Sequence, residues 1–124
     1  MGLFKRNKNT NKPVIRQIID LVPRWLLESC RKTYKTDKGC SKYKTYDQFV
    51  ALTFGQLNKC QSLNDISAGI GVSEIFIKDI GLAQSPARST MSDGNKNRDW
   101  RVFESLYYRL LSHYKSVLNQ HHNT

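Results

Sequence analysis

Polar side chains that can donate hydrogen bonds are concentrated between residues 86 and 98, where few residues are apolar. Arg88 and Asn95 are seven residues apart, which on a helix places them on one face, two turns from each other. Arginine and asparagine bind guanine and adenine bidentately in the major groove. The alternative is a solvated surface helix. We predict that the base-reading residues are Arg88, Ser89, Thr90, Ser92, Asn95, Lys96 and Arg98.

Positive charge is concentrated in the N-terminal third of the chain. The 124 residues have a formal net charge of +10, and residues 1–44 contain 12 Lys and Arg against 3 Asp and Glu. Such an excess favours a polyanionic partner, although the lysines before residue 13 could simply solubilise a tail. Binding to phosphates would weaken steeply with salt because counterions are released. The predicted phosphate-binding residues are Arg31, Lys32, Lys35, Lys38, Lys42 and Lys44.

Signatures of catalysis and metal binding are missing from the sequence. It contains no G-x-S-x-G, no phosphate-binding loop and no H-E-x-x-H. The acidic residues after residue 44 are scattered and are better explained as caps and surface charges than as a two-metal carboxylate cluster. The three cysteines include no C-x-x-C pair, and the histidines lack partners at ligand spacing. We therefore expect no catalytic residue, no metal and no cofactor.

Apolar residues recur with helical spacing along most of the chain, and no segment alternates with a period of two. The sequence predicts an all-α, compact bundle of about five to seven helices. Residues 1–12 are expected to form a disordered basic arm, residues 13–120 the helical domain and residues 121–124 a tail. The helices are expected over residues 13–22, 24–34, 45–57, 62–70, 74–80, 86–96 and 99–118.

Helix starts and faces can be predicted from local pairs of residues. Thr45 with Gln48, and Ser62 with Asp65, are typical of capping boxes, and Ser85 before Pro86 indicates a capped start. Apolar residues nearly encircle the helix over 45–57, which we expect to be central. The apolar face of the helix over 99–118 is expected to lie in the core.

Residues 62–80 match a helix-turn-helix template. Ile66 and Ile70 are apolar, Ser67 is small at the expected crossing, and Gly71 lies in the turn. The second helix of this pair offers few hydrogen-bond donors on its outward side, whereas a helix that reads bases should be rich in them. We therefore expect a helix-turn-helix-like portion here, with base reading assigned to the helix after Pro86.

Two stretches resemble a known family. They are Phe54-Gly-Gln-Leu-Asn-Lys-Cys-Gln-Ser-Leu-Asn-Asp-Ile66 and Arg88-Ser-Thr-Met-Ser-Asp-Gly-Asn-Lys-Asn-Arg-Asp-Trp-Arg-Val-Phe-Glu104. Both are similar to the N-terminal region of bacterial transposases of the insertion-sequence-four group, as are residues 18–25 and 46–49 in the same order. The resemblance covers about residues 13–114. Gly94 departs from it, since we would expect Ala, and the helix is expected to loosen or break there.

The resemblance implies a domain that precedes a ribonuclease-H-like catalytic domain with an Asp-Asp-Glu triad. That catalytic part is not found in this sequence, because no acidic residue follows Glu104. The implied function is binding of double-stranded transposon-end DNA in the bacterial cytoplasm, at the nucleoid, without catalysis. The implied partners also include a homodimer or the full-length transposase, with no small-molecule substrate and no membrane, since the apolar runs are too short to span one.

Two alternatives to DNA binding remain open. The chain could be a protein-interaction module, in which the helices over 62–80 or 100–118 mediate dimerisation or inhibit a transposase. It could also be the product of a decayed reading frame without activity. A monomer that binds DNA would favour the first function, and a tight dimer indifferent to DNA would favour the interaction module.

Overall fold

The computed structural model describes residues 12–122, and within this range the chain is all-α, as predicted. None of its helices is both long enough and apolar enough to cross a bilayer. The predicted disordered arm at residues 1–12 lies outside the described range except for Lys12. The helices are α1 (Val14–Ile19), α2 (Arg24–Tyr34), α3 (Thr45–Leu57), α4 (Leu63–Ile70), α5 (Glu74–Asp79), α6 (Arg88–Asn97) and α7 (Arg101–His122).

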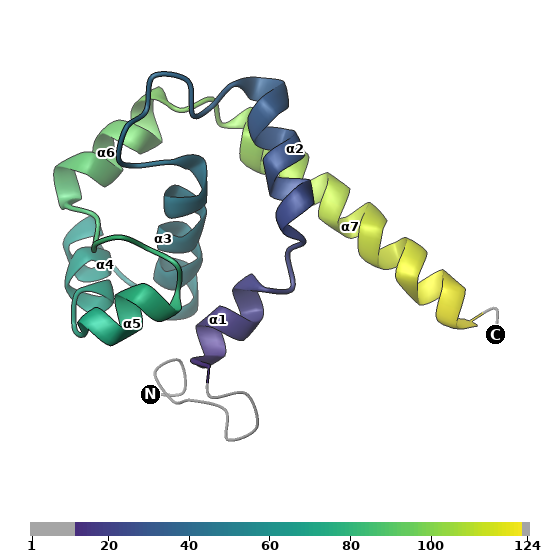
Figure 1. Cartoon of the computed structure of the whole chain (residues 1–124), viewed down its shortest axis with the longest axis horizontal. Helices are drawn as coiled ribbons and strands as arrows, with labels where there is room; N and C mark the ends of the chain where they lie inside the picture. The colour runs from purple at the N-terminus through teal and green to yellow at the C-terminus, as the bar shows by residue number, and fades with distance from the viewer. Residues whose placement is uncertain (1–11, 123–124) are drawn as a thin grey trace.

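Helix α3 lies at the centre of the fold, as its apolar residues predicted, with α1 on one side and α4 on the other (Figure 1). Its side chains Val50 and Phe54 are fully buried. They join a core that α1, α4, α5 and α6 complete. The buried residues of this core are Ile15, Ile19, Val50, Ala51, Phe54, Ile66, Ile70, Phe76, Ile80, Leu82 and Met91.

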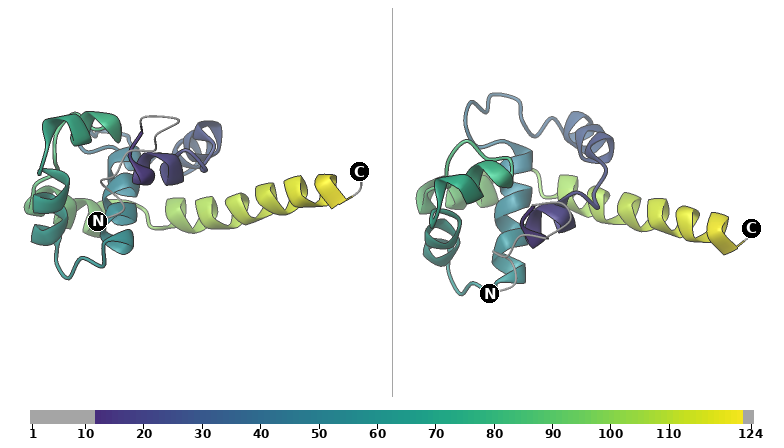
Figure 2. Two further views of the ribbon diagram at one scale, coloured as in Figure 1. Left: turned by 90° about the horizontal axis from the view of Figure 1, so that it is seen from below. Right: turned by 60° about the horizontal axis from the view of Figure 1, so that its bottom comes forward.

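A second, smaller core joins α2 to the first turns of α7. Leu26, Leu27 and Cys30 of α2 pack against Val102 and Leu106 of α7. The two cores are connected through α3, because its partly buried rings Tyr46 and Phe49 contact both. The C-terminal turns of α7 extend away from the body (Figure 2). The expectation that its whole apolar face lies in the core is therefore wrong.

Helices α3 and α4 approach each other closely because each presents a glycine to a large side chain of the other. A Cβ on Gly55 would lie 2.7 Å from Cδ1 of Ile66. A Cβ on Gly69 would lie 2.7 Å from the ring of Phe54. Phe54 is buried and its ring is rigid, so it has no room to retreat.

We predict that Gly69→Ala destabilises the protein. Alanine favours a helix by about 1 kcal/mol over glycine, but the clash with Phe54 should outweigh this gain and lower the free energy of unfolding by about 1–3 kcal/mol. Urea unfolding followed by circular dichroism measures the change. Asn64→Ala, on the exposed side of the same helix, is the control and should shift stability by less than about 0.5 kcal/mol. An unchanged midpoint for Gly69→Ala would contradict this packing.

Two predicted helix starts differ from the observed ones. Thr45 is the first residue of α3 rather than its cap, and its N–H and hydroxyl both donate to Oδ1 of Asp37, each at 2.6 Å. Ser85 does not cap α6, because its hydroxyl donates to the carbonyl of Ser67 at 2.7 Å. The start at Ser62 is confirmed, since its Oγ accepts from the N–H of Asp65 at 3.2 Å.

The segment predicted as a helix-turn-helix forms α4 and α5, joined by residues 71–73. Ile66, Ile70 and Ile80 are buried, as the template requires. Helix α5 has only six residues, and Ile75 on it is 65% exposed. The helix-turn-helix assignment therefore stays a prediction.

Candidate nucleic-acid interface

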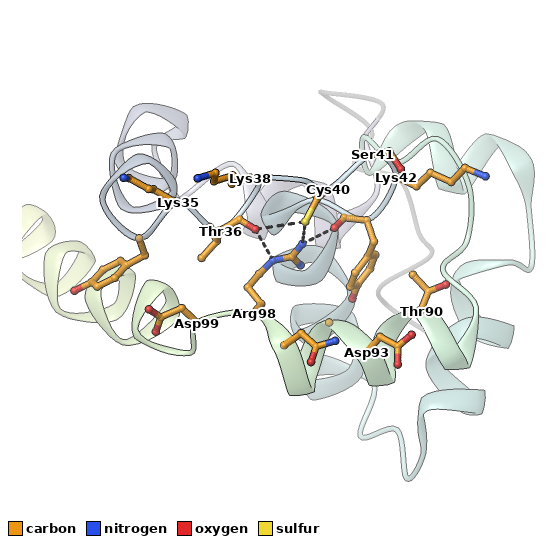
Figure 3. Close-up of a pocket in the computed structure, with 14 residues that line it drawn as sticks. Lys35, Thr36, Lys38, Cys40, Ser41, Lys42, Thr90, Asp93, Arg98 and Asp99 are labelled. Atoms are coloured by element: carbon orange, nitrogen blue, oxygen red, sulfur yellow. Dashed lines mark hydrogen bonds between the residues drawn. The ribbon is translucent and has the colours of Figure 1, made fainter.

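The segment between α2 and α3, residues 35–44, lies beside α6. We call it the lysine loop. Together with α6 it encloses a groove of about 530 Å³, the loop–α6 groove (Figure 3). Lys35, Lys38 and Lys42 line it from the loop, and Thr90 and Asn97 line it from α6. The structure thus places half of the predicted phosphate-binding residues against one side of the predicted base-reading helix.

The position of the lysine loop is set by Arg98, which immediately follows α6. A guanidinium group has five N–H donors, and here all five are used within the chain. Arg98 was predicted to read bases, but its donors are already engaged, so we remove it from that set. The five N–H groups of Arg98 donate to the carbonyls of Thr36 (3.2 Å), Lys44 (3.3 Å) and Tyr43, to Oε1 of Gln48 (2.7 Å) and to Sγ of Cys40 (3.4 Å).

Tyr43 fastens the loop to α6 through its ring. A Cβ on Gly94 would lie 2.7 Å from Cε2 of Tyr43, so the absence of a side chain there lets the ring rest on the helix. The expected loosening at Gly94 is wrong, because α6 continues to Asn97. Burial raises the pKa of Tyr43 to about 12, against the opposing effect of the nearby Arg98 guanidinium, so the phenol stays neutral at physiological pH.

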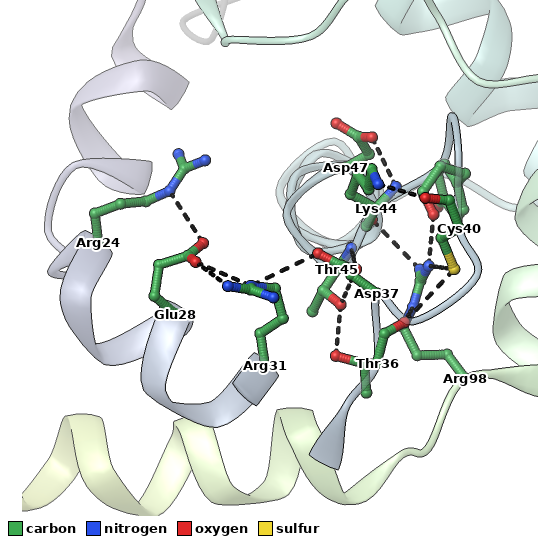
Figure 4. A network of polar contacts seen from close by, with 11 residues as sticks. Arg24, Glu28, Arg31, Thr36, Asp37, Cys40, Lys44, Thr45, Asp47 and Arg98 are labelled. Atoms are coloured by element: carbon green, nitrogen blue, oxygen red, sulfur yellow. Dashed lines mark hydrogen bonds and ion pairs between the residues drawn. The ribbon is translucent and has the colours of Figure 1, made fainter. Parts of the chain in front are cut away.

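A polar network on the other side of the loop joins the end of α2 to the start of α3 (Figure 4). Arg31 pairs with Glu28 at 2.7 Å and with Asp37 at 3.8 Å, and Asp37 also receives the hydrogen bonds of Thr45. The hydrogen bond to Glu28 is the main cause of the raised pKa of Arg31. Nζ of Lys44 donates to the carbonyl of Cys40. Arg31 and Lys44 were both predicted to bind phosphate. Their contacts within the chain show that they stabilise the fold.

The other predicted phosphate-binding lysines, one near the end of α2 and three in the lysine loop, are placed differently. Lys32, Lys35, Lys38 and Lys42 are exposed, and among the ion pairs of the described residues none involves these four. Their ammonium groups therefore face solvent without a carboxylate partner. They are the cations of this region with the greatest capacity to bind an external anion.

The predicted base-reading residues do not all face the groove. Thr90 lines it, whereas Arg88, Ser89 and Lys96 are exposed outside it, and Ser92 is partly buried outside it. Oδ1 of Asn95 accepts a hydrogen bond from Nε2 of Gln48 at 2.8 Å, which turns this side chain toward α3. The predicted pairing of Arg88 with Asn95 is thus weakened, because one member is held by the core helix.

Sequence reasoning missed Asn97, an exposed amide that lines the groove. The signal was present, because Thr90, Asp93, Gly94 and Asn97 follow the spacing of one helical face. Asp93 brings a negative charge to the groove, while Asp99 is paired with Arg101 at 2.7 Å. Among the described residues no group of three or more potential ligands could hold a metal ion.

We predict that Arg98→Lys detaches the lysine loop. A lysine ammonium cannot reproduce the planar fork that binds several carbonyls at once, so the free energy of unfolding should fall by about 2 kcal/mol or more. Arg101→Lys is the matched control: Arg101 is 58% exposed in an ion pair with Asp99, and its replacement should change stability by less than about 0.5 kcal/mol. Urea unfolding measures both variants. Equal effects would refute the anchoring role of Arg98.

Residues 10–83, more than half of the chain, match the model of a family described as a domain of unknown function, DUF4372. The matched segment includes the lysine loop and ends before α6. Neither a search of curated proteins nor one of solved structures found a match. The chain therefore belongs to the family of this domain of unknown function, DUF4372.

Proposed function

We propose that this chain is the DNA-binding module of a transposase, non-catalytic by itself, and that it holds double-stranded transposon-end DNA at the loop–α6 groove. The observation that carries the proposal is the arrangement of Lys35, Lys38 and Lys42. They lie along one groove without carboxylate partners among the described ion pairs, and Arg98 holds the loop that bears them. Lysines placed in this way suit the regularly spaced phosphates of a duplex.

Helix α6 supplies the polar groups that could distinguish bases. Its groove side presents the hydroxyl of Thr90 and the amide of Asn97, next to the lysine loop. An asparagine amide matches the N6 and N7 edge of adenine in the major groove. We therefore shift the proposed base contacts from the Arg88 and Asn95 face toward Thr90 and Asn97, and keep Arg88 as the alternative.

The transposase context rests on the resemblance of residues 54–66 and 88–104. The first stretch contains Phe54, Gly55 and Ile66, which form the close packing of α3 on α4. The second contains Arg98, which holds the lysine loop, and also Gly94, which departs from the resemblance. Both stretches thus contain residues on which the packing depends, at the α3–α4 contact and at the lysine loop, which supports the proposal of a shared fold and a shared mode of DNA binding.

We predict that the triple variant Lys35→Gln, Lys38→Gln and Lys42→Gln binds duplex DNA at least about tenfold more weakly than the wild type. Each lost phosphate contact should also reduce the salt slope of the logarithm of affinity by about one. Fluorescence anisotropy with a labelled duplex at several salt concentrations measures both quantities.

The control for this triple variant is Lys12→Gln, Lys59→Gln and Lys78→Gln, which removes the same charge elsewhere. Lys35 and Lys59 both have a positive φ, 52° and 53°, so the backbone cost is matched too. The control should retain most of the affinity. Asp93→Asn should tighten binding, since it removes a negative charge from the groove. Equal losses in the two triple variants would show that only net charge matters and would overturn the groove as the site.

Base discrimination provides a separate prediction. Preferred duplexes are first selected from a random pool with the wild-type chain. Asn97→Ala should then reduce the ratio of affinities for selected and scrambled duplexes by about tenfold, because one bidentate base contact is lost. Arg88→Ala, outside the groove, should leave this ratio nearly unchanged. The reverse result would assign base reading to the outer face of α6.

A further inference from the structure

Helix α7 and the residue before it carry a row of large apolar side chains that are more than one third exposed. Trp100, just before the helix, is 66% exposed, and Tyr107, Leu111 and Leu118 are between 52% and 59% exposed. With Tyr114, which is 36% exposed and whose hydroxyl donates to the carbonyl of Leu21, they follow one another at steps of seven, four, three and four residues. This is the spacing of a coiled-coil seam in which one position, residue 104, is not apolar. We call these five residues the α7 seam.

The α7 seam is distinct from the face that packs on α2. Ser105 contacts Cys30, Arg109 donates to Ser29 at 2.6 Å, and the ring of His113 meets that of Trp25. By helical spacing, these α2-facing residues lie on the other side of α7 from Tyr107, Leu111 and Leu118. Helix α7 is thus held on one side by its own chain and is apolar on the side turned away from it.

The size of the seam is sufficient for a protein interface. At roughly 200 Å² for each large side chain, the exposed parts of these residues and the neighbouring Tyr108 amount to roughly 500–700 Å² on one chain. Two such surfaces would bury roughly 1,000–1,400 Å², which reaches the lower range of specific interfaces. A seam with heptad spacing fits a second helix of the same spacing, and another copy of α7 provides one.

Charge determines the direction of such a pair. Glu104 is the acidic residue of α7 and continues the seam spacing between Trp100 and Tyr107, and Lys115 lies eleven residues further on. In a parallel pair the two Glu104 carboxylates would face each other. In an antiparallel pair with Tyr107 opposite Leu111, Glu104 of each copy comes beside Lys115 of the other, and Trp100 lies opposite Leu118.

We propose that two copies of this chain associate through the α7 seam as an antiparallel, two-fold symmetric helix pair. The isologous arrangement uses the same surface on both copies and closes on itself. It does not depend on DNA or on the loop–α6 groove. The proposal can therefore fail or hold independently of the proposed DNA-binding function.

Sedimentation equilibrium of the full chain without DNA tests the association. The wild type should be dimeric at about 100 µM, since an interface of this size supports micromolar affinity. Leu111→Lys should raise the dissociation constant at least about tenfold. Leu52→Lys, the same change at a leucine of α3 that is 41% exposed, is the control and should leave it unchanged. Circular dichroism confirms that both variants fold.

A charge exchange tests the direction. Glu104→Lys and Lys115→Glu should each weaken the dimer, by about tenfold for the two symmetric contacts, and the double variant should recover wild-type affinity. Within one copy the two residues are three helical turns apart, so recovery requires contact between copies. A wild type that stays monomeric would overturn the proposal and leave the seam to another partner. A dimer without recovery in the double variant would overturn the antiparallel arrangement.

Discussion

The arrangement of the candidate site depends on one guanidinium group. The lysine loop has no regular structure and buries few apolar side chains, so little hydrophobic stabilisation holds it. Arg98 replaces that stabilisation with five hydrogen bonds, three of them to carbonyls of the loop. A partly buried charge would be costly without partners, and here the backbone of the loop supplies them. The loop and α6 therefore form one structural unit.

Pairing of charged groups within the chain also explains why the net charge overstates the positive charge that is available to a ligand. Arg31 is held by Glu28 and Asp37, and Arg98 is surrounded by acceptors. Asp37 in turn accepts hydrogen bonds at the first turn of α3, so the polar network also fixes where the central helix begins. Arg31 and Lys44, which have partners within the chain, flank the four exposed lysines that can bind an anion. Composition does not separate the two kinds, because only their partners differ.

The accuracy of the sequence-based predictions follows the range of the interactions involved. Helix identities and the central place of α3 were predictable, since apolar spacing within a few turns determines them. The start of α4 was predictable too, because Ser62 bonds Asp65 three residues later. The partner of Ser85 is 18 residues away and that of Arg98 is up to 62 residues away. No local pattern indicates partners at such distances. The cap assigned to Ser85 was therefore wrong, and the base-reading role was assigned to Arg98 without knowledge of its internal partners.

Helix α7 shows a different limit of sequence reasoning. Apolar residues at helical spacing predict that a face is buried, but they do not say whether the same chain buries it. Leu106 is buried against α2, whereas Leu111 is 52% exposed, although both follow helical spacing. Their difference comes from the side of α7 on which each lies, because Leu106 is on the side that packs on α2, with Arg109 and His113, and Leu111 is on the other side. If two copies pair along the uncovered part, the two-fold axis also relates their loop–α6 grooves, and a duplex held by one would raise the effective concentration of DNA at the other.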